Sequence, residues 1–206
     1  MEHYYSESPA SELRIKKISQ NINGVKFEFY TSSGVFSKDK IDMGTLILAE
    51  NMIIGKNFKV LDIGCGIGIL GIAASRLFGA KAVMVDINKR AVMLAKKNIG
   101  LNKTSAEIFQ GNLYENINQN DFDAVLSNPP QSAGKELCFQ LIEESKNYLK
   151  QNGNLQIVAR HNKGGKTLSK KMEEVFGNSK IIARESGYSV YLSVKFKNKI
   201  TFLPIK

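Results

Sequence analysis

The stretch VLDIGCGIGILG, residues 60–71, decides the fold, because an apolar run leads directly into a loop that contains Gly64, Gly66 and Gly68. Glycines between a strand and a helix let the backbone approach a ligand closely, and the helix N-terminus offers unpaired N–H groups. Gly64, Gly66 and Gly68 form the pattern G-x-G-x-G. Gly66, Gly68 and Gly71 instead form the dinucleotide fingerprint G-x-G-x-x-G, so the glycines alone leave two kinds of nucleotide open.

Two carboxylates flank this loop. Asp86 ends the next apolar run, and its carboxylate is placed to accept hydrogen bonds from both hydroxyls of a ribose in either interpretation. Asp62 discriminates between them, because it stands two residues before Gly64, where a dinucleotide loop usually has an apolar residue. A carboxylate there would repel a pyrophosphate and attract an ammonium group. The loop therefore favours a ligand that carries an amino-acid ammonium.

From residue 58 onward, short β-branched runs alternate with helix-length amphipathic segments, which is typical of a parallel sheet covered on both faces. Helices are expected to open near Gly68, Asn88, Gly134 and Lys166, and residues 179–196 read as two strands joined by a glycine turn. The sequence predicts an α/β fold, Rossmann-like, with a seven-stranded mostly parallel sheet and an antiparallel C-terminal hairpin. The expected parallel strands are 58–63, 82–86, 106–110, 122–127 and 154–160.

The region before residue 58 has a different character. Residues 12–19 are expected to form a helix, residues 25–31 and 34–38 a short hairpin, and residues 42–53 a helix that leads into the first parallel strand. No repeat or low-complexity linker separates the two regions. We therefore expect one domain over 1–206, with 1–57 as an N-terminal elaboration and 58–206 as the cofactor-binding core. The helix that follows Gly134 is expected to end on Gly153.

The composition restricts the function further. The chain has 206 residues, is 43% hydrophobic and carries a formal net charge of +10, which suggests a polyanionic partner such as nucleic acid. No apolar run approaches a membrane span and no secretory layout precedes the core, so we expect a cytoplasmic protein without a membrane partner. Cys65 and Cys138 form neither a disulfide framework nor a metal-binding spacing, and no metal is expected.

SNPPQ, residues 127–131, follows the fourth parallel strand and is the second decisive motif. Two prolines fix the backbone and remove two N–H donors, which leaves the Pro129 carbonyl and the Asn128 side-chain carbonyl as convergent acceptors. Such a pair can draw the hydrogens of an exocyclic amine out of the plane of its ring and expose the nitrogen lone pair. Asp62, Asp86 and Asn128 all fall at strand carboxyl ends, where open parallel sheets bind ligands.

These motifs together resemble those of class I S-adenosylmethionine-dependent methyltransferases, and within that class the methyltransferase small domain family, which includes small-subunit ribosomal RNA guanine-N2 methyltransferases and stand-alone archaeal relatives. The similarity runs from TSSGVFSKDKIDMGTLILAEN (31–51) through LDIGCGIGILGIA (61–73), DINKRAVMLAKKN (86–98) and SNPPQSAGKE (127–136) to GYSVYLSV (187–194). It implies that Asp62 and the glycine loop hold the methionine end of S-adenosylmethionine, Asp86 the ribose and Asn112 the adenine. The further cofactor contacts that it implies are Gly64, Cys65, Gly66, Gly68, Ile87, Leu113, Asn128, Phe36, Asp42 and Thr45.

The resemblance assigns catalysis to Asn128, Pro129 and Pro130, and it implies RNA as the partner, in the form of ribosomal RNA or a ribosomal subunit. The chain departs from the family at two positions. Asn112 replaces the usual Asp, and its carbonyl can still accept a hydrogen bond from the adenine amino group. Gln131 stands where an aromatic residue often stacks on the target base, so Phe36 or Tyr188 would have to supply the platform.

Four functions follow from these motifs. The leading one is methylation of an exocyclic amine of an RNA base, guanine N2 of ribosomal RNA in particular. The same chemistry on adenine N6 or on a protein glutamine amide is the second. The third is a non-catalytic module that binds RNA and cofactor, against which the intact NPP motif argues. A dehydrogenase is the fourth, and the position of Asp62 argues against it.

Overall fold

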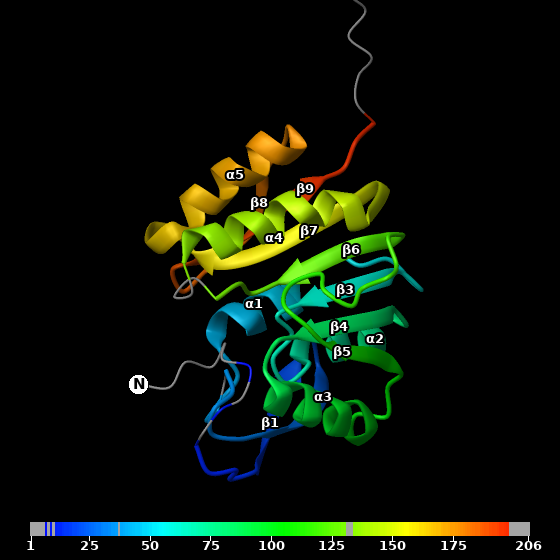
Figure 1. Cartoon of the computed structure of the whole chain (residues 1–206), viewed down its shortest axis with the longest axis vertical. Coiled ribbons are helices and arrows are strands. Elements are labelled where there is room, and N and C mark those ends of the chain that lie inside the picture. The colour runs from blue at the N-terminus through cyan, green and yellow to red at the C-terminus, as the bar shows by residue number, and fades with distance from the viewer. Residues whose placement is uncertain (1–6, 8, 10, 37, 131–133, 198–206) are drawn as a thin grey trace, which may run out of the picture.

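The computed structural model describes residues 7, 9, 11–36, 38–130 and 134–197. Its centre is a seven-stranded sheet in the order β5-β4-β3-β6-β7-β9-β8 (Figure 1). The strands from β5 to β7 in this order run parallel, and β9 pairs antiparallel with both β7 and β8. The strands are β3 (Lys59–Ile63), β4 (Lys81–Asp86), β5 (Ala106–Gln110), β6 (Phe122–Ser127), β7 (Leu149–Arg160), β8 (Lys180–Glu185) and β9 (Tyr188–Val194). The predicted sheet and its C-terminal hairpin are confirmed.

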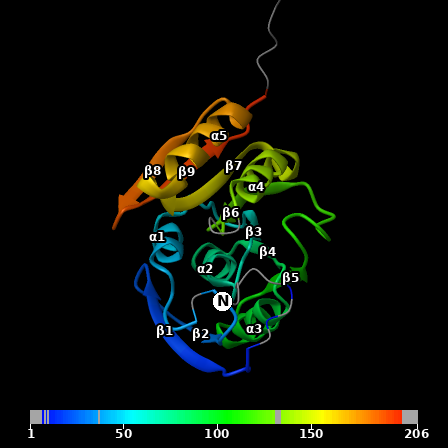
Figure 2. The same ribbon diagram turned by 60° about the vertical axis from the view of Figure 1, so that its left-hand side comes forward.

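Helices cover both faces of this sheet. One face packs in a single apolar cluster with the first three helices and with the hairpin of β1 (Lys16–Ile22) and β2 (Val25–Thr31). The other face packs with the last two helices. Figure 2 shows these two groups on separate sides. The helices are α1 (Met43–Asn51), α2 (Ile69–Phe78), α3 (Lys89–Leu101), α4 (Lys135–Tyr148) and α5 (Lys166–Phe176). In the part of the chain that the structure describes, no helix is both long and apolar enough to cross a membrane.

The central strands show why the sheet is buried on both faces. Residues 60–63 of β3 are all buried, as are residues 124–127 of β6, so these strands form continuous apolar runs, apart from Asp62 and Ser127. After β3 the chain moves outward to β4 and β5, and it later returns to place β6 on the other side of β3. The carboxyl ends of β3 and β6 therefore open at the point where the strand order reverses, which is where such sheets bind ligands.

The N-terminal hairpin differs from the prediction. Residues 12–19 do not form a helix, because β1 (Lys16–Ile22) pairs antiparallel with β2 (Val25–Thr31). The two-residue turn Asn23–Gly24 has φ values of 49° and 81°, and an Asn-Gly pair is the preferred sequence for such a turn. Phe27 and Phe29 alternate inward along β2 and are fully buried. The prediction that residues 34–38 pair with β2 is therefore wrong, because β2 pairs with the preceding strand, β1.

Gly153 does not end the helix that follows Gly134. Helix α4 stops at Tyr148, and β7 begins directly at Leu149, so Gly153 lies inside that strand. The pairing of β6 with β7 is irregular beside it, and a Cβ atom on Gly153 would lie 3.0 Å from the carbonyl oxygens of Lys150 and Phe122. Glycine is needed there because two backbones approach closely at a bulge. Since glycine is also typical of helix ends, its presence led to the wrong prediction.

Candidate active site

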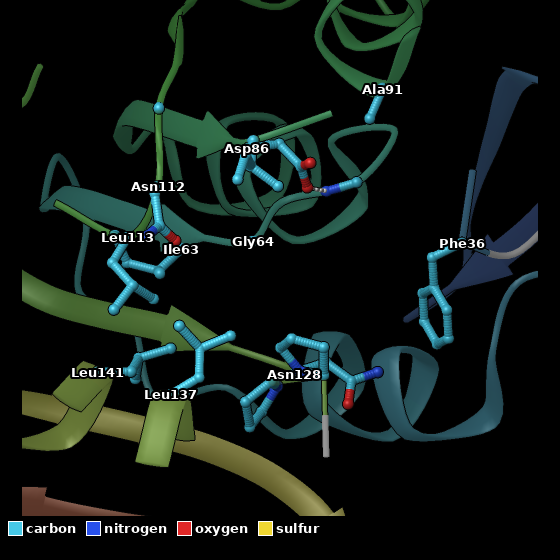
Figure 3. A pocket seen from close by; sticks show the side chains of 15 residues that line it. Phe36, Ile63, Gly64, Asp86, Ala91, Asn112, Leu113, Asn128, Leu137 and Leu141 are labelled. Carbon is cyan, nitrogen blue, oxygen red and sulfur yellow. Dashed lines mark hydrogen bonds between the residues drawn. The ribbon is translucent and has the colours of Figure 1, made fainter. Parts of the chain in front are cut away.

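A pocket of about 320 Å³ opens at the carboxyl ends of β3, β4 and β6. This is within the usual size of small-molecule sites. The loop after β5, the NPP turn and α4 complete its walls, and Phe36 faces Asn128 across the opening (Figure 3). The lining residues are Phe36, Ile63, Gly64, Gly66, Asp86, Ile87, Ala91, Gly111, Asn112, Leu113, Asn128, Pro129, Pro130, Leu137 and Leu141. Asp62, Cys65 and Thr45 line a smaller hollow that shares Phe36, Gly64, Gly66 and Asn128 with this pocket.

The glycine loop curves around one end of the pocket. Gly64, Gly66 and Gly68 have φ values of 67°, 56° and 89°, a left-handed conformation that side chains disfavour. Gly71 has a different role, because a Cβ atom there would lie 2.5 Å from the sulfur of Met84 on β4. The first three glycines therefore shape the loop, whereas the fourth allows α2 to pack on the sheet.

Asp62 is a buried carboxylate with one unsatisfied oxygen. Its Oδ2 accepts a hydrogen bond of 2.9 Å from the backbone N–H of Gly71, and no described residue donates to its Oδ1. Burial raises the pKa of Asp62 to about 7, and the nearby charge of Asp86 adds to the rise. An unsatisfied buried acceptor is costly, and a cationic donor in the adjoining hollow would satisfy it. The residues present therefore fit the ammonium group of an amino-acid ligand.

Asp86 is held at the end of β4 by backbone donors. Its Oδ2 accepts from the N–H of Gly66 at 2.7 Å, and its Oδ1 accepts from the N–H of Asn88 at 2.9 Å. Burial raises the pKa of Asp86 to about 6, although these two hydrogen bonds act in the opposite direction. Each carboxylate oxygen has a second lone pair, so the group that fixes the glycine loop can still accept hydrogen bonds from a ligand in the pocket.

Asn128 is oriented by two side chains of the α1 N-terminus. Its amide nitrogen donates to Oδ2 of Asp42 at 3.0 Å and to Oγ1 of Thr45 at 2.8 Å. Asp42 also caps α1 by accepting from the backbone N–H of Thr45. Because a carboxylate offers only acceptors, the NH₂ end of the Asn128 amide is directed to α1. Its carbonyl oxygen receives no hydrogen bond from a described residue and stays available as an acceptor.

The remaining predicted site residues differ in their positions. Ile87, Asn112 and Leu113 line the pocket, and Cys65 is a buried free thiol whose pKa is raised well above its ordinary value by burial. Tyr188 is absent from the residues that line the pocket, and the guanidinium of Arg160 lies 4.9 Å from the centre of its ring. Of the two proposed aromatic platforms, only Phe36 therefore lies at the pocket. Gln131 falls outside the described residues.

Sequence reasoning missed the apolar wall that α4 contributes. Leu137 and Leu141 line the pocket from successive turns of that helix, directly after the NPP turn. Their i, i+4 spacing is a signal of an inward helix face, but it does not distinguish a pocket wall from ordinary core. The sequence assigns Asp42 and Thr45 to the cofactor and does not predict the hydrogen bonds that the Asn128 amide nitrogen donates to their side chains.

Comparison with known proteins identifies the family of this chain. The fold and site define a class I S-adenosylmethionine-dependent methyltransferase. The model of the methyltransferase small domain matches residues 26–192, and the chain belongs to that family. The resemblance drawn from the motifs is thereby confirmed.

Two curated relatives match most of this chain. The uncharacterized protein YbxB of Bacillus subtilis is 33% identical over 94% of this chain and 98% of its own length. Ribosomal RNA small subunit methyltransferase C of Colwellia psychrerythraea is 29% identical over 85% of this chain and 50% of its own length.

The solved structure of the T. thermophilus 16S rRNA N2 G1207 methyltransferase (RsmC), in complex with AdoMet and guanosine, shares the fold with a TM-score of 0.78. It is 24% identical to this chain, and the match covers 91% of this chain and 52% of that one. The chain thus spans about half the length of the ribosomal RNA methyltransferases that it matches.

Proposed function

We propose that the protein transfers a methyl group from S-adenosylmethionine to an exocyclic amine of an RNA base, with guanine N2 of small-subunit ribosomal RNA as the target. The orientation of Asn128 carries this proposal, because it presents a carbonyl acceptor at the strand end where the pocket opens. The relatives named as ribosomal RNA small subunit methyltransferase C support the choice of RNA. The net charge of +10 suits a polyanionic substrate.

The cofactor roles follow the order of the groups around the pocket. Asp62 would accept from the ammonium group of the methionine end, and Asp86 from the ribose hydroxyls. The side chain of Asn112 would accept a hydrogen bond from the adenine amino group, and Ile87 and Leu113 would contact the adenine ring. The glycine loop and Phe36 would enclose the part of the cofactor between its methionine and adenine ends.

The chain's own groups would prepare the amine. When bound, the cofactor supplies a methyl group on a positively charged sulfur. The Asn128 side-chain carbonyl and the Pro129 backbone carbonyl accept the two N–H hydrogens of the amine, so its lone pair is withdrawn from conjugation with the ring. During methyl transfer, positive charge would develop on the amine nitrogen, and these two carbonyl acceptors would stabilise it. One proton then leaves for solvent, which requires no general base from the protein.

One experiment tests the substrate class. The protein is incubated with radiolabelled S-adenosylmethionine and, separately, with ribosomal RNA, small ribosomal subunits or a protein extract. We expect label in the RNA, and nucleoside digestion should place it on N2-methylguanosine. Label on N6-methyladenosine or on a glutamine amide would overturn the substrate and keep the chemistry. No label anywhere, despite binding of both cofactor and RNA, would favour the non-catalytic module.

Asp86→Asn is expected to weaken S-adenosylmethionine binding by about one to two orders of magnitude, because hydrogen bonds to a charged acceptor contribute roughly 1.5–3 kcal/mol. The amide can still accept from one of the two backbone N–H groups, so the glycine loop should keep its shape. Calorimetric titration measures the dissociation constant. Asp121→Asn is the matched control. Asp121 directly precedes β6, at the end of the strands away from the pocket, and forms an ion pair with Lys59. Equal affinities in the two variants would refute the ribose assignment.

Thr45→Val should slow methyl transfer about tenfold, because loss of one bond to the Asn128 amide nitrogen lets that amide rotate. Valine keeps the shape of threonine, whereas Thr45→Ser restores the hydroxyl and should restore the rate. Single-turnover rates and cofactor dissociation constants separate two interpretations. If Thr45 instead contacts the cofactor, as the resemblance implied, the valine variant will lose affinity and keep its rate at saturation.

A further inference from the structure

Positive charge gathers in one run of the sequence that the proposed mechanism does not use. Residues 160–171, RHNKGGKTLSKK, contain Arg160, Lys163, Lys166, Lys170 and Lys171 and no acidic residue. The run covers the end of β7, the π-helical turn η2 (His161–Gly165) and the first turns of α5. Acidic residues return only at Glu173. Such a run on one surface is the electrostatic mark of a site for a polyanion.

The topology places this run beside the proposed catalytic turn. Strand β7 is the parallel neighbour of β6, and Ile157 of β7 pairs with Ser127, the last residue before Asn128. Arg160, the last residue of β7, therefore lies at the same end of the strands as the NPP turn, one strand away. Figure 1 shows α5 next to the end of β7 on that side of the molecule. A substrate that reaches Asn128 passes close to this end of the strands.

The turn after β7 points its lysines outward. Gly165 is buried, and a Cβ atom there would lie 2.6 Å from the hydroxyl of Tyr191, so the backbone itself packs against β9. Lys163 and Gly164 leave helical geometry, with a φ of 101° at Gly164. The side chains of Lys163 and Lys166 are consequently exposed on either side of the buried glycine.

Most cations of this run have no ion-pair partner among the residues with described positions, as is also true of Lys56, Lys81 and Lys103. At the opposite end of the strands, Lys59 pairs with Asp121, and Lys150 pairs with Asp123. Lys171 pairs with Glu143 and Glu174. The other four cations of the run are all exposed and, among the residues with described positions, have no acidic partner within ion-pair distance. We call these four the basic band: Arg160, Lys163, Lys166 and Lys170.

Two further features agree with an anionic ligand there. A shallow groove lies along the band, lined by His161, Lys166 and Lys170 together with Ser169, Ser179, Ile181, Tyr191 and a single acid, Glu173. The pKa of His161 is lowered, chiefly by burial and further by the charges of Arg184 and Lys166. Arg184 and Lys166 thus add positive charge beside His161 in this groove.

The band is joined to the catalytic turn through Tyr188. Arg160 lies over the Tyr188 ring, and its Nε donates to the Tyr188 hydroxyl at 3.1 Å. The same ring packs on the first turn of α1, where a Cβ atom on Gly44 would lie 2.9 Å from it. That turn holds the Asn128 amide through Asp42 and Thr45. A continuous chain of contacts therefore runs from the band to the proposed acceptor.

We propose that the basic band binds the sugar–phosphate backbone of the RNA substrate while the target base enters the pocket at Asn128. This inference rests on the proposed function, and it locates the RNA on the β7 and α5 side of the pocket. Lysine and arginine side chains bind phosphates without reading bases, so the band contributes affinity and orientation and leaves the choice of base to the pocket.

The test compares two variants with the same change in charge. Lys163→Gln, Lys166→Gln and Lys170→Gln are combined in one variant, which leaves Arg160 and its contact with Tyr188 intact. The control combines Lys56→Gln, Lys81→Gln and Lys103→Gln, three exposed lysines at the opposite end of the strands. Fluorescence anisotropy follows binding of a labelled single-stranded RNA of about 20 nucleotides as the salt concentration is raised, and calorimetry follows S-adenosylmethionine.

In wild type the logarithm of RNA affinity should fall linearly with the logarithm of salt concentration, by about 0.7 per phosphate contact. The band variant should bind RNA at least tenfold more weakly at about 0.1 M salt, with a slope smaller by about 2, while its cofactor affinity stays unchanged. The control should stay within about threefold of wild type. A band variant that matches the control overturns this assignment alone, and so does one that loses affinity only for anionic vesicles. A wild type that binds no RNA overturns the proposed function as well.

Discussion

Replacement of Asn128 by alanine is expected to slow methyl transfer on the order of a hundredfold or more, which is the usual effect of removing one preorganised dipole from a reaction centre. The carbonyl of Asn128 matters most when charge develops on the amine nitrogen, so the contact stabilises the transition state more than the bound cofactor. S-adenosylmethionine affinity and thermal stability should therefore change little. Single-turnover transfer of radiolabel measures the rate, and calorimetry measures the affinity.

Alanine is preferred here because aspartate could still accept a hydrogen bond, and its charge would complicate the comparison. Asn118→Ala, an exposed residue in the loop before β6, provides the control for a lost amide. A wild-type rate in Asn128→Ala would mean that NPP is only a rigid turn, and the proposed mechanism would fail. A large loss of stability would indicate instead that the amide mainly anchors α1 through Asp42 and Thr45.

The parallel sheet could be predicted because its signal is local. The runs that became β5 and β6 were expected at 106–110 and 122–127, which are their observed bounds, and β3 and β4 differ by one residue at their starts. Asn88 was expected to open a helix, and its side chain accepts from the backbone N–H groups of Arg90 and Ala91. Each of these features depends on residues that are close together in the sequence.

Features that depend on contacts between distant segments could not be predicted in the same way. The composition of residues 12–19 is compatible with both a helix and a strand. The Asn23–Gly24 turn favours the strand, because it joins β1 and β2 in a hairpin. Phe196 lies in the segment expected to form the C-terminal hairpin, but β9 ends at Val194 and 58% of the surface of Phe196 is exposed. The bonds from Asn128 to Asp42 and Thr45 join segments more than 80 residues apart, and no spacing in the sequence reveals them.

Two carboxylates, the buried Asp62 and the partly buried Asp86, show a conflict between stability and binding. Asp62 and Asp86 both have raised pKa values, about 7 and about 6, so each loses solvation on folding that its backbone donors do not fully replace. Asp62 retains one unsatisfied oxygen. A protein selected for stability alone would place an uncharged residue there. The buried charge is explained if a cation completes the site, and this makes Asp62 the residue at which stability and cofactor affinity should separate.

Asp62→Asn should therefore stabilise the unliganded protein near pH 8 and weaken S-adenosylmethionine binding on the order of a hundredfold. The pKa of Asp62 is raised on folding, from 3.8 to about 7. Its contribution to stability is thus fully present below about pH 4 and is lost as pH rises through about 7, because the ionised form is the one that burial disfavours. Asparagine does not ionise, and its carbonyl can still accept from the N–H of Gly71.

Two measurements check this prediction, and the sign of each is fixed by the same titration. Thermal unfolding of the unliganded proteins should give the variant a free energy of unfolding a few kcal/mol higher than that of wild type at pH 8. This difference should shrink as pH falls toward 4. Wild-type cofactor affinity should weaken by up to about tenfold per pH unit below 7, because an ammonium group pairs only with the ionised carboxylate, and that dependence should largely vanish in the variant. Glu107→Gln, an exposed acid on β5, controls for the lost charge. A variant that is less stable at pH 8 yet binds the cofactor as wild type does would show that Asp62 serves only to fasten α2 to the sheet through Gly71.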